Sequence, residues 1–308
     1  MRSDKMRLGL SIRGMGYHVA AWRHPDQPAA GALDYRQFLA AAQAAERGLF
    51  DMVFLADTLS QKAVDLPPGA AAHSSWNAEL DPLMILAALA PLTRHIGLAV
   101  TMSTSYNEPF NVARRFSSLD FISGGRAAWN MVTSWGEDEA RNFGVESLKA
   151  TDARYARGRE FLEVVCKLWN SWRDGALLAD KAAGLFYDYE GVQPIHHRGA
   201  HFACHGPATI PRTPQGRPII IQAGGSDQGR EIAASTADVI YAVANSMEDA
   251  QIYYADVKGR MARYGRDPDH LKIMYGMTVF LGRTEAEARD KYEELQALID
   301  LETGLSAV

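Results

Sequence analysis

Residues 217–235, RPIIIQAGGSDQGREIAAS, join a β-branched run to an alanine-rich helical pattern through two glycines and a serine. The isoleucines predict a strand, and Ser226 stands where a helix N-cap would lie. Glycines let a backbone approach a ligand closely, and the first amides of a helix have no internal partner. Together with the helix dipole, these features predict a phosphate cradle at Gly224, Gly225 and Ser226. The alternative is an ordinary strand–turn–helix link that needs glycine only for its turn.

The same strand-then-helix order recurs along the whole chain. Strands are predicted at residues 6–12, 51–56, 96–102, 126–134, 218–223, 238–243 and 271–282, each followed by a helical pattern or a break. Parallel strands joined by helices form either a doubly wound α/β sheet or a TIM (β/α)8-type barrel. A dinucleotide-binding sheet carries its glycine turn, G-x-G-x-x-G, after the first strand, whereas here the glycines follow the fifth. Seven units in this order favour the barrel.

Two regions depart from this repeat. Residues 180–217 contain four prolines and four histidines, and they predict an insertion between strands 4 and 5, built from a hairpin and a loop. These histidines lack a fixed metal-ligand spacing, so no metal site is predicted. Only GLSAV follows residue 303, so the eighth unit of the barrel is expected to be missing, unless a strand is miscounted or the barrel closes differently. The chain, residues 1–308, is predicted to form a single barrel domain.

The composition is that of an ordinary globular protein, with 47% hydrophobic and 22% charged residues. The formal net charge of −5 argues against a nucleic-acid surface. Two cysteines provide neither a disulfide framework nor a zinc pattern. The sequence has no apolar run as long as a membrane span and no secretory signal pattern. We therefore expect a cytoplasmic protein that binds neither nucleic acid nor membranes.

Polar residues follow the predicted strands at their C-terminal ends, which form the working face of a barrel. They are Arg13, Tyr17, His18 and Trp22 after the first strand, Asp57 after the second, Thr101, Ser103 and Thr104 at the third, and Asn130, Thr133 and Ser134 at the fourth. Hydroxyls and amides outnumber charges in this set, so it suits a large polar heteroaromatic ligand better than a metal ion. For two charged residues a structural role is the alternative. Asp57 would then cap the next segment, and Arg126 would form a structural ion pair.

Several long motifs closely resemble one family of enzymes. They are GYHVAAWRHP, ISGGRAAWNMVTS, ARNFG, RYARGREFLEVVCKLWNSW and QGRPIIIQAGGSDQGREIAA. The family is that of the nitrilotriacetate, pristinamycin and dibenzothiophene-sulfone monooxygenases, within the bacterial-luciferase-like superfamily. The resemblance extends from about residue 6 to about residue 300.

This resemblance implies a flavin-dependent monooxygenase that uses reduced FMN (FMNH2) and O2 to oxidise a small organic substrate. A separate NAD(P)H:flavin reductase would supply the reduced flavin, and we expect a homo-oligomer, either a dimer or a tetramer. Flavin contacts are assigned to Asp57, Thr101, Ser103, Ser134, Tyr155, Gly224, Gly225 and Ser226. Asn130, on the predicted fourth strand, is assigned to the same set. His18 resembles a histidine near the substrate and is the candidate catalytic residue.

The chain departs from the family pattern at two points. Thr151 stands where the family commonly has a histidine four residues before Tyr155, and family members continue well beyond the end of this chain. Two alternatives therefore stay open. One is a deazaflavin-dependent hydride-transfer oxidoreductase of the same superfamily, and the other is a truncated, non-catalytic flavin-binding protein. The sequence WNMVTS, residues 129–134, favours the monooxygenase over the deazaflavin enzyme.

Overall fold

The computed structural model describes residues 5–28, 30–61 and 68–301, and its centre is a sheet of seven parallel strands. In spatial order they are β1 (Gly9–Ser11), β2 (Met52–Leu55), β3 (Gly97–Ser103), β4 (Ala127–Val132), β9 (Ile219–Gln222), β10 (Val239–Ala242) and β11 (Lys272–Tyr275). The sheet curves into a nearly closed barrel. Met274 of β11 reaches within 3.0 Å of the position that a Cβ atom on Gly9 of β1 would take. The barrel expected from the sequence is therefore confirmed as a nearly closed sheet of seven parallel strands.

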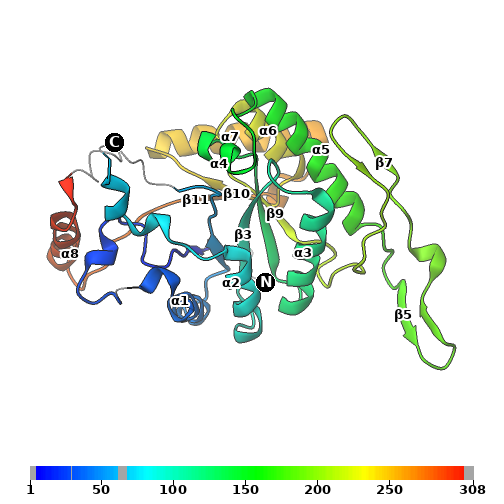
Figure 1. Ribbon diagram of the computed structural model, residues 1–308, viewed down its shortest axis with the longest axis horizontal. Helices are drawn as coiled ribbons and strands as arrows, with labels where there is room; N and C mark the ends of the chain where they lie inside the picture. Colours follow the sequence, from blue (N-terminus) through cyan, green and yellow to red (C-terminus); the bar gives the residue numbers. More distant parts are fainter. Residues whose placement is uncertain (1–4, 29, 62–67, 302–308) are drawn as a thin grey trace.

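Helices cover the outer side of this sheet (Figure 1). They are α1 (Tyr35–Arg47), α2 (Pro82–Leu89), α3 (Pro109–Ser123), α5 (Thr151–Trp169), α6 (Asp227–Thr236) and α7 (Met247–Met261). The short helix α4 (Glu137–Asn142) follows β4, and α8 (Glu285–Ala297) lies apart from the sheet. Four of these helices, α1, α6, α7 and α8, start at an N-cap whose side chain accepts a hydrogen bond from an amide of the first turn, namely Asp34, Ser226, Ser246 and Thr284. The N-cap expected at Ser226 is thus confirmed. Such caps satisfy amides that have no partner within the helix, and they fix where each helix starts after its strand.

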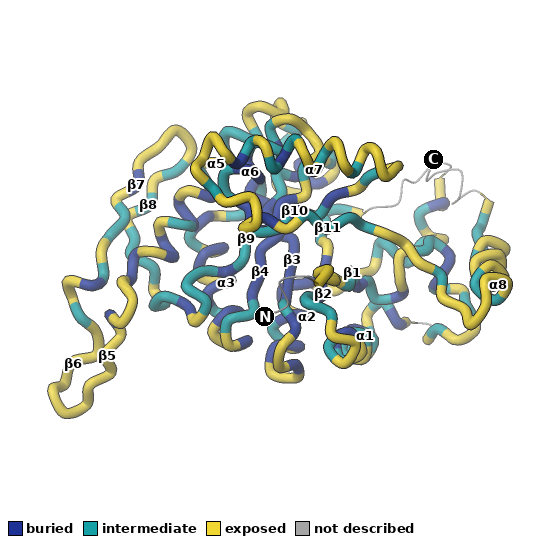
Figure 2. The backbone as a smooth tube through the Cα atoms, turned by 180° about the vertical axis from the view of Figure 1, so that it is seen from behind, coloured by how far each residue is buried: buried dark blue, intermediate teal, exposed yellow. Residues whose placement is uncertain are grey.

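The strands have two different faces because successive side chains point to opposite sides of a sheet. Leu98, Val100 and Trp129 point outward into the main core, where they pack against the surrounding helices. Phe54, Ala99, Ala128 and Ile221 form a smaller apolar cluster inside the barrel. Figure 2 shows the buried strands at the centre of the molecule and the exposed segments at its periphery.

The seventh strand is shorter than the sequence indicates. Alternating apolar residues predict a strand over residues 271–282, but β11 ends at Tyr275. Met277, Val279 and Leu281 are all exposed, and among the described residues no strand pairs with this segment. An alternating pattern is not sufficient for a strand when no neighbouring strand is present to complete the ladder. The final GLSAV, on which the expectation of a missing eighth unit rests, lies outside the described residues.

Two hairpins lie between α5 and β9 and take no part in the barrel sheet. The first joins β5 (Leu177–Asp180) to β6 (Leu185–Tyr187), and the second joins β7 (His197–Arg198) to β8 (Ala203–Cys204). The second is fastened to α5 by Glu160, whose Oε1 lies 3.1 Å from His197 Nε2 and accepts from the Phe202 amide. Within the described part of the chain, no group of His, Cys, Asp and Glu side chains is arranged to hold a metal ion.

Helix α8 lies at the far end of the molecule from these hairpins (Figures 1 and 2). None of its residues is buried, and it is joined to the loop after β1 by polar contacts. His24 Nε2 lies 3.5 Å from Glu294 Oε1, and Arg23 donates to the Leu298 carbonyl. Among the described residues, no helix combines the length and the hydrophobicity that crossing a bilayer requires.

Candidate functional site

Two polar side chains lie inside the barrel, one layer above its apolar cluster. Thr101 and Asn130 are opposite each other on β3 and β4, and Asn130 Nδ2 donates to Thr101 Oγ1 at 2.8 Å. Both residues are buried, and Asn130 Oδ1 has no hydrogen-bond partner within the described residues. Buried polar atoms are nearly always paired. This acceptor is therefore a position at which an N–H or O–H group of a ligand would bind.

Two serine hydroxyls meet where β3 and β4 end. Ser103 Oγ and Ser134 Oγ lie 2.8 Å apart, and both residues are buried. Ser134 has a φ of +52°, in the left-handed region that non-glycine residues seldom adopt. Arg154 of α5 donates to the Ser134 carbonyl and, at 3.1 Å, to Thr151 Oγ1. The hydroxyl of Thr151 is therefore engaged by Arg154.

The first turns of α5 also reach the glycine turn after β9. Tyr155 OH lies 2.9 Å from Ser226 Oγ, so α5 and α6 are joined by a hydroxyl pair. Gly158 permits the close approach of α5 to the strand ends, because a Cβ atom there would lie 3.0 Å from Thr133 Cγ2. The serine pair and the glycine turn are thus connected through one helix.

The glycine turn has the form of a cradle at the start of α6. Ser226 Oγ accepts from the Gly229 amide at 3.1 Å, and Gly224 O accepts from Tyr253 OH at 3.0 Å. Gly225 and Ser226 are exposed, and a Cβ atom added to Gly225 would meet no other atom within 4 Å. The turn therefore opens to solvent at the positive end of a helix, as an anion site requires.

We expect Gly224→Ala to destabilise the fold by about 2 kcal/mol, because a Cβ atom at this position overpacks the turn. That atom would lie 2.9 Å from the Gly229 Cα, so two backbone segments must separate. Gly225→Ala is the matched control, since its methyl group enters open space. Urea unfolding of the two variants checks this prediction. Equal free energies of unfolding for Gly224→Ala and Gly225→Ala would contradict it.

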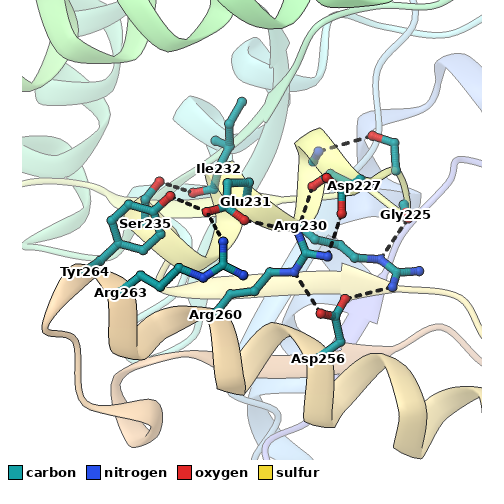
Figure 3. A network of polar contacts seen from close by, with 12 residues as sticks. Gly225, Asp227, Arg230, Glu231, Ile232, Ser235, Asp256, Arg260, Arg263 and Tyr264 are labelled. Carbon is teal, nitrogen blue, oxygen red and sulfur yellow. Dashed lines mark hydrogen bonds and ion pairs between the residues drawn. The ribbon is translucent and has the colours of Figure 1, made fainter.

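One arginine of α7 organises the acidic side chains around α6 (Figure 3). Arg260 contacts Asp227 at 2.6 Å, Asp256 at 2.8 Å and Glu231 at 3.0 Å. Its guanidinium is the main cause of the lowered pKa of the Asp256 carboxyl, which it reaches by a hydrogen bond. These carboxylates raise the pKa of Arg260 in turn. Because Asp227 directly follows Ser226, this network neutralises negative charge beside the cradle.

A second arginine connects the network to the cradle itself (Figure 3). Arg230 Nε donates to Gly225 O at 3.0 Å, and Arg230 Nη1 lies 2.8 Å from Asp256 Oδ2. Its guanidinium also lies 4.9 Å from the centre of the Tyr253 ring. The hydrogen bond from Arg230 to the Gly225 carbonyl thereby fixes the orientation of the turn.

Asp57 lies after β2 on the wall of a small cavity. The cavity has a volume of about 40 Å³ and is also lined by Arg13, Tyr17 and Glu79. A larger cavity, about 320 Å³, lies between α2 and α3 on the outer side of the barrel. The working face of a barrel is at the C-terminal ends of its strands, so the small cavity is the candidate for a functional cavity.

His18 is separate from these groups. Its Nδ1 accepts from the Ala20 amide at 3.2 Å, which assigns the proton to Nε2, and Nε2 lies 3.0 Å from Gln296 Oε1 of α8. Both ring nitrogens are thus engaged in this structure. A role for His18 in proton transfer requires the contact with Gln296 to open.

The structure thus assembles the residues expected from the sequence into several groups at the strand ends. The buried pairs are Thr101–Asn130 and Ser103–Ser134, the cradle group is Tyr155, Gly224, Gly225 and Ser226, Asp57 lies in the cavity, and His18 contacts α8. Sequence reasoning missed Arg154 and Arg260. Arg154 directly precedes Tyr155 in the motif RYARG, and that adjacency was the available signal. Arg260 lies on a separate helix with no motif around it.

Comparison with known proteins gives consistent matches. The family described as luciferase-like monooxygenase matches residues 15–303. The N-acetyl-S-(2-succino)cysteine monooxygenase of Bacillus subtilis (strain 168) is 43% identical over 304 residues, which cover 99% of this chain and 67% of that protein. Nitrilotriacetate monooxygenase component A of Aminobacter aminovorans is 43% identical over 308 residues, covering 98% of this chain and 68% of that protein.

Solved structures agree with these matches. A crystal structure of riboflavin lyase with modified FMN and the substrate riboflavin superposes with a TM-score of 0.91 at 31% identity. The match covers 98% of this chain and 69% of that chain. The chain therefore spans about two thirds of the length of the relatives that it matches.

Proposed function

The chain belongs to the luciferase-like monooxygenase family, and on that premise we propose that it is a flavin-dependent monooxygenase. It uses reduced FMN and O2 to oxidise a small organic substrate. The observation that carries the proposal is the exposed turn of Gly224, Gly225 and Ser226 at the N-terminus of α6. The relatives at 43% identity are named as monooxygenases, which favours oxygenation over deazaflavin-dependent hydride transfer.

The residues present fit a flavin mononucleotide in two respects. The open space at Gly225 and the first amides of α6 suit a phosphate group, which carries negative charge and several acceptor oxygens. The unpaired Asn130 Oδ1 suits a hydrogen-bond donor, such as the imide N–H of a flavin ring. The proposed flavin contacts are Asp57, Thr101, Ser103, Asn130, Ser134, Tyr155, Gly224, Gly225 and Ser226.

When bound, reduced FMN supplies the electron pair with which one atom of O2 enters the substrate and the other becomes water. The residues of the chain bind and orient the flavin and the substrate, and they exclude water from both. Phe54, Ala99 and Ile221 form a dry floor beneath the polar pair of Thr101 and Asn130. A site closed to water protects reactive intermediates from side reactions. We propose His18 as the catalytic candidate on the substrate side, where its neutral ring donates one hydrogen bond from Nε2.

We extend the proposal to partners and organisation. The Aminobacter relative is named as component A, which supports a division of labour with a separate NAD(P)H:flavin reductase. We propose that this chain receives reduced FMN from such a reductase, acts as one barrel domain in the cytoplasm, and assembles as a dimer or tetramer. Light scattering on the purified protein measures its oligomeric state, and a monomer would contradict the proposed dimer or tetramer.

An anaerobic titration followed by an oxygen-consumption assay tests the function. We expect reduced FMN to quench the tryptophan fluorescence saturably, and a panel of small organic compounds to contain one that is oxygenated when a reductase supplies reduced FMN. Absence of quenching with both oxidised and reduced FMN would contradict any role in flavin binding. Binding of reduced FMN without oxygenation of any compound would instead support the non-catalytic alternative.

A further inference from the structure

The first amides of the glycine turn and of α6 have no acceptor within the described part of the protein. They are the N–H groups of Gly225, Ser226, Asp227 and Gln228. The next amide, that of Gly229, donates to Ser226 Oγ at 3.1 Å. Four consecutive donors therefore remain for solvent or for one ligand. Whether they bind one ligand together depends on how firmly the turn is held.

Two glycines do not hold these donors in place by themselves. Gly224 and Gly225 lack a Cβ atom, so their backbone dihedral angles are less restricted than those of any other residue type. A ligand that binds a loose turn has to supply the free energy of ordering it, and this requirement lowers the affinity. A firm cradle therefore needs contacts from outside the turn.

Tyr253 and Arg230 provide such contacts. The Tyr253 hydroxyl, on α7, donates to Gly224 O at 3.0 Å, and Arg230 Nε, on α6, donates to Gly225 O at 3.0 Å. The Arg230 guanidinium lies 4.9 Å from the centre of the Tyr253 ring, so the two donors approach the turn from the same side. Asp256 holds Arg230 in this place by accepting from its Nη1 at 2.8 Å (Figure 3). Two successive carbonyl groups are thus fixed toward one pair of side chains.

The geometry of the peptide bond transmits this restraint to the amides. In a planar trans peptide, the C=O of one residue and the N–H of the next point in opposite directions. Because Gly224 O points to Tyr253, the Gly225 N–H points away from it. The Ser226 N–H points away from Arg230 for the same reason. Both amides therefore face the side of the turn opposite the two side chains.

Tyr253 is well placed to keep this contact. Only a protonated hydroxyl can donate to a carbonyl group, and burial raises the pKa of Tyr253 above its ordinary value. Its ring packs against the apolar cluster that includes Val257 and Met261, so the core sets its position. The adjacent Tyr254 differs, because it is 49% exposed and its ring faces Lys258, whose Nζ lies 5.2 Å from the ring centre.

We propose that Tyr253 is a positioning residue of the cradle, which together with Arg230 orders the Gly225 and Ser226 amides toward one anion before that anion binds. The assignment of the anion to the flavin phosphate rests on the proposed monooxygenase function. Folding then supplies the free energy of ordering the turn, and the affinity rises accordingly. Because the ordered amides serve the phosphate group, Tyr253 contributes to a preference for FMN over riboflavin.

The positioning itself is tested by 15N relaxation in the flavin-free, deuterated full chain. Tyr253→Phe removes one oxygen atom and leaves the ring in place. We expect the order parameters of the Gly225 and Ser226 amides to fall from about 0.85 to below about 0.6 in this variant. Tyr254→Phe, the next residue of the same helix, is the matched control and should leave both values unchanged. A low Gly225 value in the wild type, or an equal value in Tyr253→Phe, would overturn the role of Tyr253.

Anaerobic fluorescence titrations with the two reduced flavins test the consequence for binding. Tyr253→Phe should weaken the binding of reduced FMN about fivefold, as expected for the loss of one hydrogen bond, and that of reduced riboflavin less than about twofold. Tyr254→Phe should change neither. Equal losses for both flavins would overturn the proposed preference, because a general loss of structure affects both alike.

The two experiments separate this proposal from the proposed function. The relaxation measurement contains no flavin, so its outcome does not depend on flavin binding. Loosened amides in Tyr253→Phe, in a protein whose wild type binds neither flavin, would uphold the positioning role and remove the proposed monooxygenase function. Unchanged amides in a protein that binds reduced FMN would remove the role of Tyr253 alone.

Discussion

We expect Gly225→Asp to lower the affinity for reduced FMN by at least about 100-fold. The new side chain would enter the open space of the cradle, where a Cβ atom meets no neighbour. Two unit charges of the same sign repel by about 4 kcal/mol at 4 Å in a partly exposed site. Solvent reduces this value at the exposed Gly225, and about 2.8 kcal/mol corresponds to the 100-fold loss. The aspartate can also accept the amide hydrogen bonds that the phosphate would otherwise receive.

Comparison with riboflavin makes this experiment specific for the phosphate. Reduced riboflavin lacks the phosphate group, so its affinity should change less than about threefold in Gly225→Asp. The neutral, isosteric Gly225→Asn is the matched control and should retain most of the affinity for reduced FMN. Anaerobic fluorescence titrations give all of these dissociation constants. Equal losses for both flavins would contradict the assignment of the cradle to a phosphate.

Much of the fold could be predicted because its determinants are local. The strand and helix patterns, the N-cap at Ser226 and the proline at the start of α2 each depend on a few neighbouring residues. The position of the glycine turn after the fifth strand argued against a dinucleotide-binding sheet, and seven strand-then-helix units in order favoured a barrel. The exception is residues 276–282, where an alternating pattern lacks a neighbouring strand within the described residues. Strand pairing is a long-range property, so no local pattern could show this.

The residues of the candidate site also differ in how far the sequence could predict them. Thr101 and Asn130 could be found because barrel topology brings strand ends together whatever the side chains are. The partners of Arg126 could not be predicted, because they come from three separate elements. Arg126 donates to Ser123 O at the end of α3, to Ala90 O after α2 and to Ile96 O just before β3. These contacts lie at the N-terminal ends of the strands, and they give Arg126 a structural role. The lack of a hydrogen-bond partner among the described residues for Arg13 Nη2 and Trp76 Nε1 could not be predicted either, because pairing is known only once every neighbour is in place.

Arg260→Met should destabilise the protein by about 3 kcal/mol, near the low end of the range for breaking a buried ion pair. The Arg260 side chain is 13% exposed, and its removal leaves Asp256 and Glu231 close together without their shared cation. Arg230 and Arg263 remain beside these carboxylates and limit the loss. Arg263→Met is the matched control. Its side chain is 64% exposed and reaches the same Glu231, so it should cost less than about 1 kcal/mol.

The pH dependence of this loss distinguishes the ion network from simple loss of packing. The pKa values of Asp256 and Glu231 are lowered in the folded protein, Asp256 mainly by the Arg260 hydrogen bond and Glu231 mainly by that of Tyr264. A lowered carboxyl pKa stabilises the fold above the unfolded pKa of about 4, and this contribution is lost as the pH falls through the folded value. The stability difference between wild type and Arg260→Met should therefore be largest near pH 7 and shrink below about pH 4. Urea unfolding across this range measures it. A difference that stays constant with pH would show that Arg260 contributes through its packed side chain, and the cradle would then have no electrostatic support from α7.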